Sequence, residues 1–332
     1  MYHCHVEASE HVQMGMYGAL VIYPSMNSLA KNGITKCNRS GYWKLNGVRQ
    51  CQIPKDATNR NFAYNNIHSY FDKEYVMLLS DIDSVWHDNV YKQGQPDPPP
   101  AFNPVDFKPD FWLVNGRAFP DTLVNHPLTM NNISDKNLTQ INYDSYVHVK
   151  TGQKFLLRMI NMGYQVVPWH IHGWHFMVVG KDGHISPFLA MASNMEHINH
   201  EETEMGFTNT IGSGETYDLI ITADDKRDLY RNYIVNGQDG FASLCSQINK
   251  IYMDNPSAIF NIPEEPVDCN NPALIKYINY IQVCMQNSCD NNDNFFPQFY
   301  PMHNHDDYKV TNNGKYPGGQ LTLIQTDAPD SE

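Results

Sequence analysis

The stretch that decides the fold is residues 166–179, which read VVPWHIHGWHFMVV. β-Branched and aromatic residues dominate this stretch, and Gly180 follows it directly. Two other stretches have a similar character: residues 146–149 alternate between apolar and polar, and residues 154–160 are almost continuously apolar. Both patterns are typical of strands in a β-sandwich. The sequence therefore predicts an all-β chain.

Histidines recur in pairs separated by one residue. The pairs are His3 and His5, His170 and His172, and His303 and His305. With 15 histidines in 332 residues, random placement would give roughly one such pair or fewer. Residues i and i+2 of a β-strand lie on the same face, so each pair is predicted to present two imidazoles to one side.

The first pair flanks a cysteine. Cys4 lies between His3 and His5, and His11 and Met16 follow it. A thiolate, an imidazole and a weak thioether ligand are the donors of a mononuclear blue-copper site. Because Cys4 points away from its two neighbours on a strand, it could bind one copper while they bind other copper on the opposite face.

Together these motifs resemble those of the multicopper oxidases, which include the laccases. That family has an H-x-H-G motif early in a cupredoxin domain, as at residues 170–173, and an H-C-H motif near its end, as at residues 3–5. Residues 111–117, 211–220 and 236–237 fit as well, and the resemblance covers nearly the whole chain. It implies cupredoxin-like Greek-key β-sandwich domains, copper as the cofactor and dioxygen as the electron acceptor.

Two departures from the family pattern are informative. Val167 stands where a blue-copper domain has a histidine before the proline, and Asn304 stands where it has a cysteine between the final two histidines. The domain that contains them is expected to bind no blue copper. The arrangement is similar to that of two-domain laccases with the type 1 copper in domain 1. In those proteins a trinuclear cluster forms between neighbouring subunits of a homotrimer.

The resemblance also implies a role for each ligand. Cys4, His11 and Met16 would bind the type 1 copper, His3 and His5 the type 3 pair, and His170 the type 2 copper. His172, His303 and His305 would complete the type 3 ligands from the neighbouring subunit. His3, Cys4 and His5 would carry electrons between the sites, and a complete subunit would hold about four coppers. Six residues separate Cys4 from His11, two more than in the usual laccase run.

Two other functions stay open. A copper nitrite reductase shares the two-domain trimer and the type 1 site, but its catalytic copper needs only three histidines. A non-catalytic cupredoxin that binds copper or carries electrons would fit Val167 and Asn304, although loss of activity should also have eroded the four retained histidines. Among reductants, phenols and the ions Cu(I), Fe(II) and Mn(II) are all compatible with the sequence.

The predicted domain boundaries follow from these motifs. Residues 1–24 are interpreted as the C-terminal remnant of domain 1, because a complete sandwich of this kind takes roughly 100 residues. Residues 25–72 are predicted to be a linker, and residues 73–332 domain 2 with a helical insertion at about 240–298. The chain is thus expected to be truncated at its N-terminus. It would supply six of the eight cluster histidines and three of the four type 1 ligands, and would be inactive alone.

The number of cysteines and the net charge limit the cellular compartments and the partners that this chain can have. Six cysteines besides Cys4 could form disulfides, with Cys37 and Cys51 a plausible local bridge. This favours an extracellular or periplasmic protein whose signal peptide is missing with the N-terminus. A net charge of −13 argues against nucleic acid or an anionic membrane as a partner. No apolar run approaches the roughly 18 residues that a membrane span needs.

Overall fold

The computed structural model describes residues 1–124, 144–195, 198, 205–226 and 296–329 of the chain. The chain divides into two compact units, of which one comprises Met1–Ala223 with Gln298–Glu332 and the other Asp224–Pro297. The first unit contains every predicted metal ligand. The predicted helix of the 240–298 insertion lies outside the described residues, as do Cys245, Cys269, Cys284 and Cys289.

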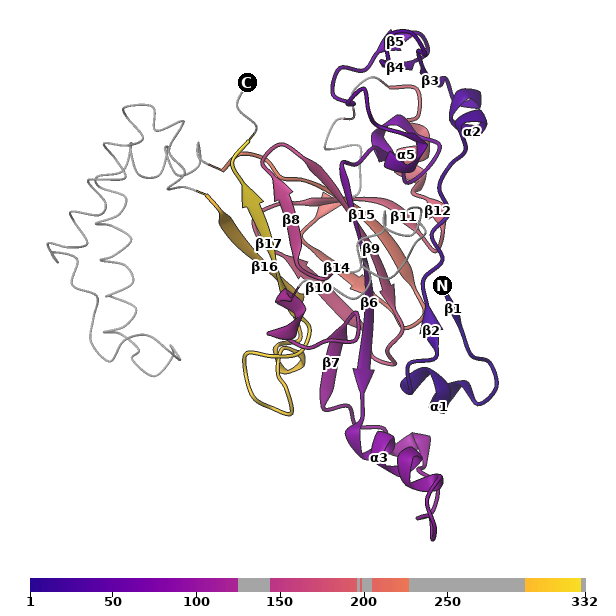
Figure 1. Cartoon of the computed structure of the whole chain (residues 1–332), viewed down its shortest axis with the longest axis vertical. Helices are drawn as coiled ribbons and strands as arrows, with labels where there is room; N and C mark the ends of the chain where they lie inside the picture. The colour runs from indigo at the N-terminus through magenta and orange to yellow at the C-terminus, as the bar shows by residue number, and fades with distance from the viewer. Residues whose placement is uncertain (125–143, 196–197, 199–204, 227–295, 330–332) are drawn as a thin grey trace, which may run out of the picture. The chain divides into compact units, whose positions relative to one another are not determined.

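Two β-sheets form the body of this unit (Figure 1). The first has the order β14 (Thr208–Ile211), β10 (Val167–Ile171), β16 (Gln298–Asn304), β17 (Leu321–Asp327) and β8 (Val147–Lys150). The second has the order β12 (His184–Ile185), β11 (Phe176–Lys181), β15 (Thr216–Thr222), β9 (Lys154–Asn161), β6 (Lys73–Ile82) and β7 (Phe111–Val114), with β13 (Met205–Gly206) paired to β11. Pairing is antiparallel within both sheets except between β6 and β9 and between β17 and β8.

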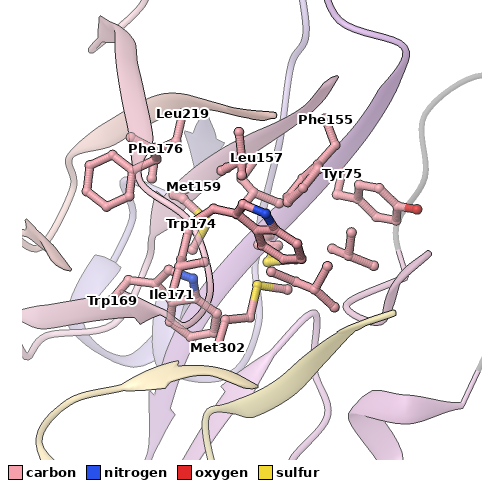
Figure 2. Close-up of a cluster of buried hydrophobic side chains, with 14 of the residues drawn as sticks. Tyr75, Phe155, Leu157, Met159, Trp169, Ile171, Trp174, Phe176, Leu219 and Met302 are labelled. Atoms are coloured by element: carbon pink, nitrogen blue, oxygen red, sulfur yellow. The ribbon is translucent and has the colours of Figure 1, made fainter. Parts of the chain in front are cut away.

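The main hydrophobic core lies between the two sheets. Trp169, Ile171 and Met302 face it from the first sheet, and Tyr75 and Leu157 are among the residues that face it from the second (Figure 2). Each of these five side chains is at most 1% exposed. The two-residue period of the strands places alternate side chains in this layer. The all-β sandwich predicted from the sequence is therefore confirmed.

The N-terminal segment covers part of the outer face of the second sheet. β1 (Tyr2–His3) pairs with β2 (Tyr17–Gly18), and α1 (Ala8–Gln13) lies between them in the chain. Val12 packs with Val76, Ile160 and Met162 of the sheet and its following turn. Of residues 16–24, only Tyr17–Gly18 are in a strand, so most of this segment packs as irregular chain.

Residues 25–72, which the sequence predicts to be a linker, contain a small packed sheet. It consists of β3 (Ile34–Lys36), β4 (Trp43–Leu45) and β5 (Val48–Arg49), preceded by α2 (Met26–Lys31) and followed by the short helices η1 (Asn59–Asn61) and η2 (Ile67–Ser69). Trp43 and Leu29 are fully buried in a hydrophobic cluster that consists only of residues from this segment. Cys37 and Cys51 are both free, so the predicted bridge between them is not formed.

The remaining described helices are short. They are α3 (Ser84–Gln93), η3 (Pro104–Asp106), η4 (Asp121–Leu123), α5 (Pro187–Met191) and η9 (Asp307–Lys309). Within the described residues, no helix is both long enough and apolar enough to span a membrane.

A buried group of charges lies on the outer face of the second sheet. The Arg158 guanidinium donates to Glu74 through Nε, and to Asp218 through Nη1 at 3.1 Å. Tyr23 donates to the same glutamate and Tyr64 to the same aspartate. Although burial alone would lower the pKa of Arg158, the two carboxylates raise it above its ordinary value. Both carboxylates are thus compensated by one buried cation.

Replacement of this cation tests its contribution to stability. The Arg158→Met substitution leaves Glu74 and Asp218 buried without a cation, and should lower the free energy of unfolding by about 3–5 kcal/mol. Denaturant unfolding measures the change. Lys181→Met is the matched control, because Lys181 pairs with Glu215 at the surface, where water screens the interaction. Equal stability of Arg158→Met and the parent would contradict the interpretation.

Candidate metal centre

Four histidines converge on the outer side of the first sheet. β10 and β16 pair antiparallel, with His170 opposite His303 and Trp169 opposite Asn304. Because side chains alternate, Trp169 and Asn304 are fully buried, whereas His170 and His303 are partly exposed. His172 lies two residues after His170, and His305 lies two residues after His303, so both are on the same side of the sheet as these partners. The predicted imidazole pairs of this domain therefore form a single group.

The four imidazoles are close enough to share metal ions. Ring centroids of His170 lie 4.8 Å from His172, 5.5 Å from His303 and 4.8 Å from His305. The Nε2 atoms of His172 and His303 are 3.2 Å apart. Ligand nitrogens of His170, His172 and His303 all lie within 4.8 Å of one another. This donor set fits copper or another borderline divalent ion, for which imidazole is a suitable ligand.

The protonation state of the group favours metal binding. Partial burial, and then repulsion among the neighbouring imidazolium forms, lower the pKa of His170 and of His172 below the ordinary 6.5. Both imidazoles are therefore neutral at neutral pH. A neutral imidazole has the free lone pair that a metal ion requires.

Backbone contacts hold the two histidine strands in register. The His305 N–H donates to Pro168 O at 2.8 Å, and the His172 N–H donates to Pro301 O at 3.0 Å. Gly173 follows with a φ of +90°, and a Cβ there would lie 2.5 Å from Cδ1 of Tyr300. Glycine is thus required after His172, both by the backbone conformation and by the tyrosine ring.

Val167 and Asn304 occupy structural positions in the interior. Val167 is 3% exposed, in the core between the sheets. The Asn304 amide donates to Gln320 Oε1 at 2.8 Å and accepts the Asp306 N–H at 3.0 Å. The amide oxygen and nitrogen are both engaged, so this side chain serves to fix the strand between the two histidines.

Of the predicted type 1 ligands, the structure brings the side chains of Cys4 and His11 together and pairs the backbone of Met16 with that of Cys4. Cys4 Sγ lies 3.1 Å from Nδ1 of His11, a residue of α1. The Cys4 N–H donates to Met16 O at 3.0 Å, which sets the methionine opposite the cysteine across the β1–β2 pair. The His3 and His5 rings lie 4.5 Å apart, as expected for residues that share a face.

Two features were not predicted from the sequence. Carboxylate oxygens of Glu7 and Glu10 lie within 4.8 Å of a His11 ring nitrogen, a proximity that α1 creates. Thr208 Oγ1 lies 2.6 Å from His170 Nδ1. Within the described residues, no hydrogen bond or ring contact joins His3 or His5 to the group of four histidines. One copy of the chain therefore presents two separate groups.

Gly173 is tested by comparison with a second glycine. Gly152 also has a φ of +90°, but a Cβ there would meet nothing within 4 Å. Both Gly→Ala substitutions should cost about 1–2 kcal/mol for the backbone conformation. Only Gly173→Ala should add about 1–3 kcal/mol from the crowded tyrosine and weaken Cu(II) binding. Unfolding curves and Cu(II) titrations check this, and equal results for the two variants would contradict it.

Because the pKa values of His170 and His172 are lowered, the metal-free protein should lose stability in acid. The unfolded chain takes up protons on these imidazoles near pH 6.5, before the folded chain does. The free energy of unfolding should therefore fall as the pH drops below 6.5, until it passes the folded-state pKa values. Urea unfolding across this range measures the slope. A double variant His170→Gln/His172→Gln should flatten it, and an unchanged slope would contradict the assignment.

No protein-family model and no curated protein matches the sequence. Similar solved structures include the blue copper oxidase of Nitrosomonas europaea, at 20% identity and a TM-score of 0.40, over 78% of this chain and 45% of that one. The multicopper oxidase mgLAC is 19% identical with a TM-score of 0.46, over 99% of this chain and 56% of that one. The laccase of Botrytis aclada is 14% identical with a TM-score of 0.33, over 80% of this chain and 32% of that one.

The chain spans about half or less of the length of each of these three proteins.

Proposed function

We propose that the chain belongs to a laccase-like multicopper oxidase, which couples one-electron oxidation of a reductant to the reduction of dioxygen to water. The observation that carries this proposal is the convergence of His170, His172, His303 and His305 on one side of the first sheet. A mononuclear site needs only three imidazoles. A fourth within 5.5 Å of two of the others supports a site for more than one ion.

A second donor set supports a blue-copper site in the N-terminal segment. Cys4 and His11 offer a thiolate and an imidazole, and Met16 lies opposite Cys4. Copper, when bound, supplies the one-electron redox chemistry and the activation of dioxygen. The chain's own part is to hold the ions and to join the sites. Cys4 is bonded through the backbone to His3 on one side and His5 on the other.

The open arrangement of the two histidine groups supports a shared cluster. His3 and His5 form one group and the four histidines of the sandwich form another, with no contact between them among the described residues. Following the resemblance to two-domain laccases, we propose a cluster between subunits of a homotrimer, with His3 and His5 from one copy and the four histidines from the next. A symmetric ring joined by such head-to-tail contacts closes without unpaired ends.

Two further proposals rest on the sequence alone. The oxidase would take electrons from a small molecule or a metal ion, and it would be exported to an extracellular or periplasmic location. A copper nitrite reductase is the second candidate, because three of the four histidines form a compact group by themselves.

Copper content and EPR of the full-length natural protein test the oxidase. About four coppers per subunit should be present, with one blue signal, one type 2 signal and an EPR-silent pair. The Cys4→Ser variant should lose the blue colour and the oxidase activity. Cys51→Ser is the matched control, because Cys51 is free and exposed, and it should keep both.

Two other outcomes would overturn the proposal. About two coppers per subunit, both visible by EPR, would support the nitrite reductase instead. Retention of the blue colour in Cys4→Ser would remove Cys4 from the metal site.

A further inference from the structure

We propose that Thr208 is a positioning residue for the metal centre: its hydroxyl holds the proton on Nδ1 of His170 and so leaves Nε2 as the ligand atom. This inference rests on the proposed role of His170 as a metal ligand. The distance of 2.6 Å between Thr208 Oγ1 and His170 Nδ1 is that of a short hydrogen bond.

The strand pairing makes the position of Thr208 rigid. β14 pairs with β10 in a register that sets Thr208 directly opposite His170. The neighbouring residues Asn209 and Trp169 are also paired; the tryptophan is fully buried and the asparagine is 9% exposed. Both strands are therefore anchored in the core beside the site. The Ile171 N–H also donates to Phe207 O at 2.8 Å. The hydroxyl is thus presented by a paired strand, and such sites are more precise than sites on loops.

The ring of His170 is confined on a second side by Phe207. Their centroids lie 5.6 Å apart with an interplanar angle of 89°, an edge-to-face contact. His172, His303 and His305 lie around the same imidazole at 4.8–5.5 Å. With the threonine at Nδ1 and the phenylalanine beside the ring, rotation of His170 is restricted, and Nε2 is the nitrogen without a partner in the described structure.

The chemistry of the two groups fixes the direction of the hydrogen bond in the metal-bound form. A neutral imidazole carries one proton, so a lone pair on Nε2 requires the proton to be on Nδ1. Thr208 Oγ1 then accepts that N–H, and its own hydroxyl proton can turn towards water because Thr208 is exposed. Partners of this kind commonly orient metal-binding histidines and raise their basicity.

His303 has the same relation to a different acceptor. Its Nδ1 lies 2.9 Å from the backbone oxygen of Asn304, which leaves Nε2 to face Nε2 of His172. His303 therefore depends on the backbone, which no substitution removes, whereas His170 depends on one side chain. Thr208 is accordingly a position at which the surroundings of His170 can be altered without replacement of a ligand.

The experiment uses Cu(II) titration and EPR on the Cys4→Ser protein, in which the blue site does not contribute. Thr208→Val removes the hydroxyl at nearly constant shape and should weaken Cu(II) binding by about 10–100-fold, the usual effect of losing such a partner. The EPR hyperfine splitting should change as well. Thr208→Ser restores the hydroxyl and should recover both the affinity and the spectrum.

Thr210→Val is the matched control, since Thr210 lies on the same strand and is also exposed, but it is opposite Pro168. It should bind Cu(II) as the parent does. Imidazole ¹⁵N NMR of the metal-free proteins gives a second readout: the Nδ1-protonated form of His170 should dominate in the parent and decrease in Thr208→Val.

Each outcome decides the inference. Tight Cu(II) binding with an unchanged spectrum in Thr208→Val would overturn the role of Thr208 while the four-histidine site stands. Equal loss in Thr208→Val and Thr210→Val would show a general effect on β14 and would also overturn it. A parent that binds no Cu(II), in contrast, would overturn the proposed function and the role of Thr208 together.

Discussion

The antiparallel pairing of β10 with β16 is the constraint on which both the core and the metal centre depend. It brings His172 and His303 together although they are 131 residues apart in the sequence. The same ladder directs Trp169 and Met302 into the core between the sheets. Packing on one side of the strands therefore fixes the histidines on the other. A change that loosens the packing of Trp169 should also disturb the imidazoles, because His170 is the next residue in the strand.

The period of two made this arrangement predictable. The H-x-H motifs, the aromatic residues between and beside them, and the glycine after His172 all follow from what a half-buried strand requires. Strands at β8, β9, β10 and β11 were also predicted, from alternating or almost continuously apolar residues. The hydrogen bonds of Asn304 give this side chain a structural role between the two histidines, and the predicted absence of a blue copper from this domain stays a prediction.

Other features depend on contacts between distant segments, which local patterns do not encode. Residues 25–72 were predicted to be a linker, yet Trp43 and Leu45 are buried there against Leu29 of α2 and the aromatic rings of Phe62 and Tyr70. α1 is only six residues long, too short for a clear periodic signal. Thr208 is an ordinary strand residue by sequence, and only the register of β14 against β10 identifies its partner.

Arg158 has a consequence for how the strands find their alignment. The second sheet is apolar on both faces, so the hydrophobic pattern of β9 alone would tolerate a shift by one residue. Such a shift would turn Arg158 into the layer between the sheets, away from Glu74 and Asp218, where an unpaired ion costs several kcal/mol. Misaligned forms of this strand are therefore disfavoured during folding. Besides stabilising the finished sheet, Arg158 would thus favour one of the two alignments that the apolar pattern of β9 permits.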